Sequence, residues 1–151
     1  LLFMKTFFKP EDRREIVERL GSLDPDSPRR WGRMNAPEMV AHLTDQMSIC
    51  LGDKQAAPMP GVYRWPGIRY LTLHVLPWPR GRVKGPPESL MRQPESWPED
   101  LAELLNLVGR FARENPARSW PEHAMFGPMS GEEWGAFCYK HFDFHLQQFG
   151  R

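Results

Sequence analysis

Hydrophobic and polar positions follow the period of an α-helix in four long stretches of the chain. These stretches cover residues 10–20, 35–51, 96–115 and 130–149. In each of them apolar residues recur three and four positions apart, which places them on one face of a helix. Residues 65–76 show part of the same spacing. We expect a short helix there, although its β-branched and aromatic residues also permit a strand. The pattern predicts an all-α protein.

Capping residues mark the start of three of the long helices. An N-cap side chain followed three residues later by Glu can satisfy free backbone N–H groups in both directions. The three expected pairs are Asn35 with Glu38, Ser96 with Glu99, and Ser130 with Glu133. The first helix instead has Pro10 in its first turn and Gly21 after its end, an arrangement typical of helix boundaries.

Two of the predicted helices have a polar or small-residue side that we expect to face solvent. In the second long helix this side contains Pro37, Ala41, Thr44 and Ser48. In the last helix it contains Glu132, Glu133, Ala136, Lys140, Asp143 and Gln147.

A long connection rich in Pro and Gly separates the second and third long helices. It covers residues 52–95, and a connection of this length inside a domain usually has structure of its own. Four long helices with one long crossover predict a four-helix bundle. We expect residues 1–151 to form this bundle as a single domain.

Composition and charge narrow the classes of function. The chain has 151 residues, of which 40% are hydrophobic and 26% charged, as in ordinary globular proteins. A net charge of +1 argues against nucleic-acid binding through bulk electrostatics. No apolar run approaches the ~20 residues of a membrane span, and the first residues lack the apolar region of a signal peptide. We expect a cytoplasmic protein that binds neither nucleic acid nor membrane.

Two histidines lie four residues apart on the apolar side of the last helix, His141 and His145. This spacing stacks them roughly 5–6 Å apart at Cβ, and an unpaired buried polar group costs about 1–3 kcal/mol. One shared metal ion would satisfy both. The alternative is two core histidines bonded to backbone carbonyls or water. His42, at the edge of the buried side of the second long helix, is the candidate third ligand. Three imidazoles leave a fourth position open on a tetrahedral ion, as catalytic zinc sites do.

Other reactive side chains have simpler interpretations. Cys138 could be a fourth ligand or a reactive thiol, but a small buried hydrophobic residue is the favoured interpretation. His123 could line the mouth of a site, but a loop histidine bonded to the backbone is favoured. The two cysteines, Cys50 and Cys138, are too few for a disulfide framework. The chain has no phosphate-binding loop, nucleophile elbow or Cys-x-x-Cys pair, which argues against nucleotide and redox-disulfide chemistry.

Three segments together resemble the DinB/YfiT-like superfamily of metal-binding bundles, and more narrowly one of its bacterial branches without an assigned activity. They are MNAPEMVAHLTDQ, HAMFGPMSGEEWG and YKHFDFHLQQFG, and the resemblance covers roughly residues 31–150. It implies a four-helix bundle with a long crossover, often dimeric, with a divalent metal on His42, His141 and His145. Some relatives are transferases that use low-molecular-weight thiols such as bacillithiol or mycothiol.

Residues and resemblance together indicate a metal-dependent enzyme with an open three-histidine site for zinc or nickel. A thiol-dependent S-transferase is the expected reaction class, acting on a small molecule, and the resemblance also implies a homodimer. We expect the pocket over the metal to be lined by Met39, Gln46, Trp134 and Cys138. Two alternatives stay open: a metal-dependent hydrolase, and a non-catalytic bundle that uses metal for stability and acts through dimerisation or a partner.

Overall fold

The computed structural model describes residues 4–81 and 84–151, and in these residues the regular structure is helical. Within these ranges there are no β-strands, and the β-type pairing is an isolated antiparallel bridge between His123 and Gly127. The predicted all-α class is therefore confirmed, and no described helix combines the length and hydropathy of a membrane span. The helices are α1 (Pro10–Gly21), α2 (Ala36–Leu51), α3 (Pro66–His74), α4 (Trp97–Arg113) and α5 (Gly131–Gln147), with the 3₁₀ helices η1 (Val62–Arg64) and η2 (Pro87–Leu90) in the crossover.

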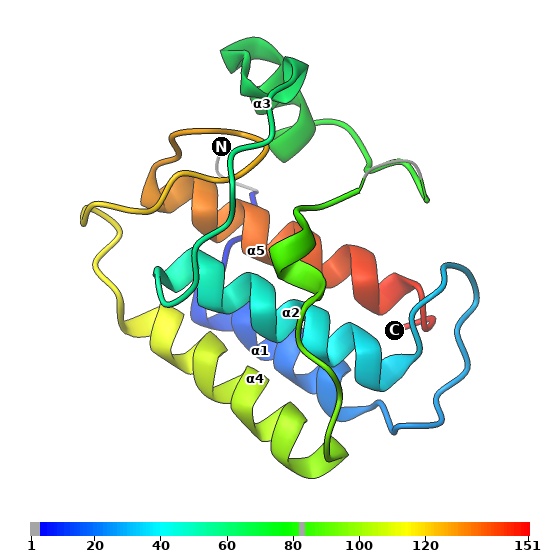
Figure 1. Ribbon diagram of the computed structural model, residues 1–151. Coiled ribbons are helices and arrows are strands. Elements are labelled where there is room, and N and C mark those ends of the chain that lie inside the picture. The colour runs from blue at the N-terminus through cyan, green and yellow to red at the C-terminus, as the bar shows by residue number, and fades with distance from the viewer. Residues whose placement is uncertain (1–3, 82–83) are drawn as a thin grey trace.

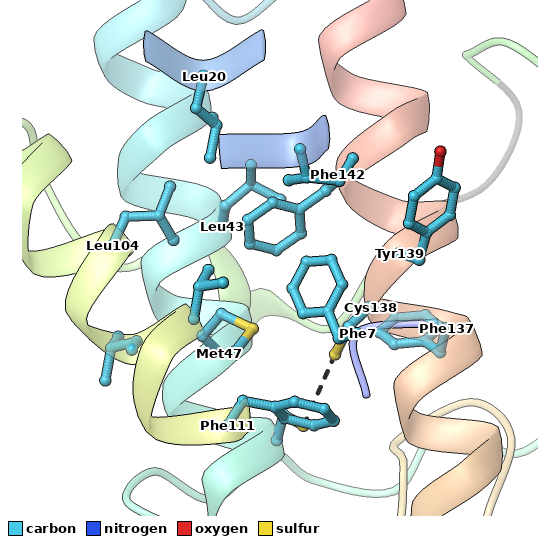
Figure 2. Close-up of a cluster of buried hydrophobic side chains, with 14 of the residues drawn as sticks. Phe7, Leu20, Leu43, Met47, Leu104, Phe111, Phe137, Cys138, Tyr139 and Phe142 are labelled. Atoms are coloured by element: carbon cyan, nitrogen blue, oxygen red, sulfur yellow. Dashed lines mark hydrogen bonds between the residues drawn. The ribbon is translucent and has the colours of Figure 1, made fainter. Parts of the chain in front are cut away.

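The four longer helices lie side by side, and α2 occupies the middle of the arrangement (Figure 1). Helix α2 packs against α4 and α5, η2 crosses its outer face, and α1 packs against α5. Helix α3 stands at one end of the molecule, where it contacts α5 and η1. The core fills the space between the long helices, and Figure 2 shows its members from α2, α4 and α5, among them Leu43, Met47, Leu104, Phe111 and Phe142.

Burial of α2 extends around nearly its whole circumference. The side expected to face solvent is buried at Ala41 and Thr44, each only 1% exposed, so that prediction is wrong. Pro37 and Ser48 are half-buried. The physical reason is that α4, α5 and η2 cover α2 from different directions. The Thr44 hydroxyl tolerates burial because it donates a hydrogen bond to the Val40 carbonyl, at 2.8 Å.

The N-termini of α2 and α5 are capped as expected. The Asn35 side chain accepts from the Glu38 N–H, and the Glu38 carboxylate accepts from the Asn35 N–H. Ser130 and Glu133 make the same reciprocal pair at the start of α5. These capping boxes confirm the sequence prediction for both helices.

The exposed face of α5 is narrower than predicted. Glu132 and Gln147 are exposed, and Lys140 and Asp143 are half-buried. Ala136 is buried, so its assignment to the solvent side is wrong. Helices α1, α2 and α3 all pack against α5, which leaves only part of its surface to solvent.

The predicted capping box of α4 is absent. Ser96 occupies the N-cap position without a side-chain cap hydrogen bond. The buried carboxylate of Asp100 instead accepts from the backbone N–H groups of Glu95 and Ser96, at 2.9 and 3.1 Å. Asp100 therefore performs the function that the sequence pattern assigned to Glu99.

Candidate metal centre

His42, His141 and His145 converge on one point between α2 and α5. The Nε2 atom of His141 lies 3.1 Å from Nε2 of His42 and 3.0 Å from Nε2 of His145. One nitrogen from each of the three rings falls within 4.8 Å of the others, an arrangement that could hold a metal ion. The structure thus brings together the three histidines that the sequence singled out.

Local helix geometry and packing each supply part of this arrangement. His141 and His145 are one turn apart on α5, so their rings stack on the same face of the helix. His42 comes from the middle of α2, which packs against that face. All three side chains are 6–8% exposed, so the centre lies just below the surface.

The outer ring nitrogens of two histidines are fixed by oxygen acceptors. Nδ1 of His42 lies 2.7 Å from the Ser89 carbonyl oxygen, and Nδ1 of His145 lies 2.7 Å from Oε1 of Gln148. A carbonyl oxygen only accepts, so each Nδ1 carries the hydrogen and each Nε2 presents a lone pair. Both lone pairs point at Nε2 of His141, whose single N–H can satisfy only one of them.

His141 has a further unsatisfied nitrogen. Its Nδ1 is buried without a hydrogen-bond partner among the described residues. Orphaned buried polar atoms are uncommon in native proteins, and a bound ion or water is one explanation for such an atom. The imbalance at these three rings therefore points to a group that accepts lone pairs.

A divalent transition metal fits the donor set. Metal–nitrogen bonds of about 2.0–2.1 Å at a tetrahedral angle place two ligand nitrogens about 3.3 Å apart. Two of the three Nε2 separations, 3.1 and 3.0 Å, are close to that value, and all three ligand atoms lie within 4.8 Å of one another. Ser89 and Gln148 also supply the oxygen partners that metal-bound histidines usually have on the outer nitrogen.

Burial keeps the three imidazoles neutral. Burial, with a smaller contribution from the neighbouring His42, lowers the pKa of His145 to about 3. Burial, followed by the adjacent imidazoles, holds the pKa of His141 well below its usual value, and burial also lowers the pKa of His42. Neutral imidazole is the form that binds metal, so the rings are ready to act as ligands near pH 7.

Aromatic side chains from two loops cover the α5 side of the centre. The Trp78 ring, from the crossover, lies 5.7 Å from the His141 ring. Trp31 packs against Phe144 at 5.1 Å, and Phe144 in turn lies 5.4 Å from His145. These contacts restrict solvent access from that direction.

A surface cavity of about 320 Å³ borders the centre on the His42 side. Its lining mixes charged and apolar side chains, and of the three histidines only His42 borders it. Besides His42, the lining residues are Arg33, Met34, Glu38, Leu90, Arg92, Gln93 and Pro94.

None of the four residues expected to line the pocket borders this cavity. Met39, Trp134 and Cys138 belong to the hydrophobic core, and Gln46 is also buried. The Trp134 indole N–H donates to the Pro121 carbonyl oxygen, at 3.0 Å. Cys138 places its sulfur 3.8 Å from that of Cys50 and is not one of the grouped donors within the described residues. These four side chains are buried, whereas the cavity is lined by the first half of α2, the end of η2 and the loop residues next to them.

His123 is a satisfied loop histidine. Its Nδ1 accepts hydrogen bonds from the backbone N–H groups of Met125 and Phe126, at 3.1 and 3.2 Å. The ring packs against Trp134 and Phe137 of α5. The favoured interpretation of His123 is thereby confirmed.

Two supporting residues escaped the sequence analysis. Gln148 lies three positions after His145, and this spacing on a helix was a usable signal. Ser89 lies in an aperiodic, Pro-rich segment 47 positions from His42, so no local pattern could connect them. No family model, curated protein or solved structure matches the chain, and the candidate function therefore rests on the chemistry of the centre itself.

Proposed function

We propose that His42, His141 and His145 bind zinc or nickel with one coordination position open, and that the protein is a metal-dependent enzyme. The proposed reaction is S-transfer from a small thiol bound at that position. One observation carries the proposal: two Nε2 lone pairs, fixed in direction by Ser89 and Gln148, meet at a third imidazole that cannot satisfy both.

The proposal of an open position is supported by the contacts of two other possible ligands, Cys138 and His123, which both interact with other groups. The Cys138 sulfur contacts Cys50, and Nδ1 of His123 is occupied by two backbone N–H groups. Within the described residues the donor group contains the three histidines alone. A ligand from solution is therefore the natural fourth partner.

A zinc or nickel ion at this centre would lower the pKa of a bound thiol or water and hold it as the anion, and both metals accept sulfur. The protein's residues would contribute orientation and access. Ser89 and Gln148 hold two rings in the correct tautomer, and Trp78 limits water on the α5 side. The cavity beside His42 admits the small molecule.

The same proposal includes the fold family. In it, α1, α2, α4 and α5 are the helices of a DinB/YfiT-like four-helix bundle, and residues 52–96 are its crossover. The placement of His42 on α2 and of His141 and His145 on α5 supports this assignment. The homodimer implied by the resemblance is part of the proposal and is open to a measurement of mass in solution.

A non-catalytic, metal-stabilised protein is the second candidate. It is favoured by the low exposure of the three histidines, because an ion held there would mainly connect α2 to α5. The two candidates differ in whether the metal accepts a ligand from solution.

Cobalt substitution distinguishes them. The cobalt protein is titrated with bacillithiol, mycothiol, glutathione and cysteine, and the absorption spectrum is followed. A sulfur-to-cobalt charge-transfer band with one of these thiols supports the transferase. If none produces the band and the coordination sphere is full before titration, the structural role replaces it. An exchangeable water without thiol binding favours the hydrolase.

Ligand variants test the donor set. Replacement of His42, His141 or His145 by Ala should abolish tight metal binding, measured by elemental analysis after gel filtration. His74→Ala, on α3, is the matched control and should retain the ion. Wild-type metal content in His42→Ala would exclude the three-histidine site.

A further inference from the structure

Cys50 and Cys138 form a buried sulfur pair between the same two helices. They lie 88 positions apart in the sequence, yet their Sγ atoms are 3.8 Å apart. Cys50 is in the last turn of α2, and Cys138 lies one turn before His141 on α5. Both side chains are almost fully buried, at 0% and 1% exposure. Figure 2 marks this contact by the dashed line that leaves Cys138.

The surroundings of the pair are apolar. Figure 2 shows the Cys138 side chain among Phe7, Phe111 and Phe137, and all of these belong to the hydrophobic core. Burial raises the pKa of the Cys50 thiol well above its ordinary value, with Cys138 adding to the effect. Cys50 is therefore a neutral thiol near pH 7, and neither sulfur belongs to the donor group of the metal centre.

The two thiols are close enough to be joined with little movement. A disulfide bond requires a sulfur separation of about 2.05 Å, so the two atoms must approach by about 1.8 Å. Side-chain rotation together with a small shift of one helix can supply a displacement of this size. A two-electron oxidation could thus join the two free thiols in a disulfide bond.

We propose that Cys50 and Cys138 are an oxidisable dithiol that forms a disulfide bond between α2 and α5, with a hydroperoxide as oxidant. One sulfur, as its thiolate, attacks the peroxide oxygen; the O–O bond breaks, giving a sulfenic acid and, with hydrogen peroxide, water. The second sulfur then attacks the sulfenic sulfur. The S–O bond breaks, the S–S bond forms, and the released hydroxide takes the remaining thiol proton as a second water. Two electrons pass from the dithiol to the peroxide.

The cross-link would join the two helices that carry the three histidines. His42 precedes Cys50 by eight residues, which is about 12 Å along α2. A disulfide that closes so long a loop restricts the unfolded chain strongly, so the oxidised protein resists unfolding more than the reduced protein. Because both sulfurs are buried, the oxidant reaches them through local opening, and oxidation is slower than for an exposed thiol.

Peptide mapping tests the proposal on the full chain, with or without metal. The folded protein is treated with hydrogen peroxide and catalase is added. The protein is then denatured with N-ethylmaleimide and digested with trypsin without reduction. We expect peptide 34–54, which contains Cys50, joined to peptide 119–140, which contains Cys138, and released by reductant. Two maleimide-labelled cysteines, or sulfinic acids on separate peptides, would overturn the proposal. This result is independent of whether the histidines bind metal.

Unfolding measurements provide a second readout. Oxidation should raise the urea midpoint of the wild-type protein and leave that of Cys50→Ala and of Cys138→Ala unchanged. Each variant keeps a small apolar side chain and loses the ability to close the bond. If either variant fails to fold, the wild-type comparison alone decides, since an unchanged or lower midpoint after oxidation contradicts a cross-link between α2 and α5.

Discussion

Helices α2 and α5 meet in two regions of opposite character. Near the middle of α2, three imidazoles face one another, and two of them, His42 and His145, depend on Ser89 and Gln148 for orientation. Toward its end, Cys50 meets Cys138 inside an apolar core. Along α2 the two regions are about 12 Å apart, and along α5 Cys138 lies about 4.5 Å from His141 and about 10 Å from His145. His42 faces the later part of α5 and Cys50 the earlier part, so the two helices run antiparallel.

The comparison separates two ways of holding helices together. Apolar side chains stabilise their region by burial, which has no direction and requires no ion. The imidazoles stabilise their region only when each nitrogen has a partner, because an unsatisfied buried polar group is costly. A change in one region should therefore have little effect on the stability of the other, and the following predictions test this independence.

The largest effect is expected from Phe111→Ala in the apolar region. Phe111 is fully buried, and its ring packs against those of Phe8 and Trp120 at 4.8 and 5.3 Å. Its loss should reduce the free energy of unfolding by about 3–5 kcal/mol. Urea unfolding followed by tryptophan fluorescence should give the same loss with and without a chelator. Val75→Ala, at an exposed position, is the control. A loss that depends on metal would mean that the two regions are coupled.

Metal removal is the matching perturbation of the histidine region. At a free metal concentration about 100 times Kd, binding stabilises the folded state by about 2.7 kcal/mol. A chelator should remove this amount and increase hydrogen exchange in η2 and around His145, while amides near Cys138 change little. His42→Ala should be insensitive to the chelator. A uniform increase in hydrogen exchange along α5 would contradict the independence of the two regions.

Acid should destabilise the metal-free protein through its buried histidines. Burial lowers the pKa of His123 to about 3, far below the unfolded value of about 6.5. Between these values the unfolded chain binds the extra proton, so stability falls as pH drops below about 6.5 and is unaffected above it. In His123→Asn the amide oxygen can replace Nδ1 as acceptor and nothing titrates. Its stability loss between about pH 6.5 and 5 should be smaller by on the order of 2 kcal/mol. If stability falls equally with pH in the wild-type protein and in His123→Asn, His123 does not contribute to the acid destabilisation.

The smallest effect is expected from Gln148→Leu. This change removes the oxygen that accepts from Nδ1 of His145 and frees the ring to rotate. Metal affinity should fall about tenfold, or about 1.4 kcal/mol, as measured by competition with a chromophoric chelator. Gln147→Leu, at the exposed neighbouring position, should leave affinity unchanged. A similar loss in both variants would show that Gln148 does not orient the ring.

Local interactions explain most of what could be predicted from the sequence, including one failure. The caps at Asn35 and Ser130 were predicted correctly because each partner lies three residues away on the same segment. The cap at Ser96 was not, because Asp100 offers a carboxylate only one position beyond Glu99 and its side chain is buried against the helix start. A local pattern with two competing acceptors does not decide between them.

The sequence by itself determined the helices and the pairing of His141 with His145, since both follow from contacts three or four residues apart. Tertiary packing decided the rest. It buried the expected solvent side of α2 at Ala41 and Thr44, because η2, α4 and α5 together pack around this helix. It also brought Ser89 to His42, and Cys50 to Cys138, across 47 and 88 positions. Contacts between such distant positions depend on how whole helices pack. The periodicity of one segment does not show which other segment packs against it.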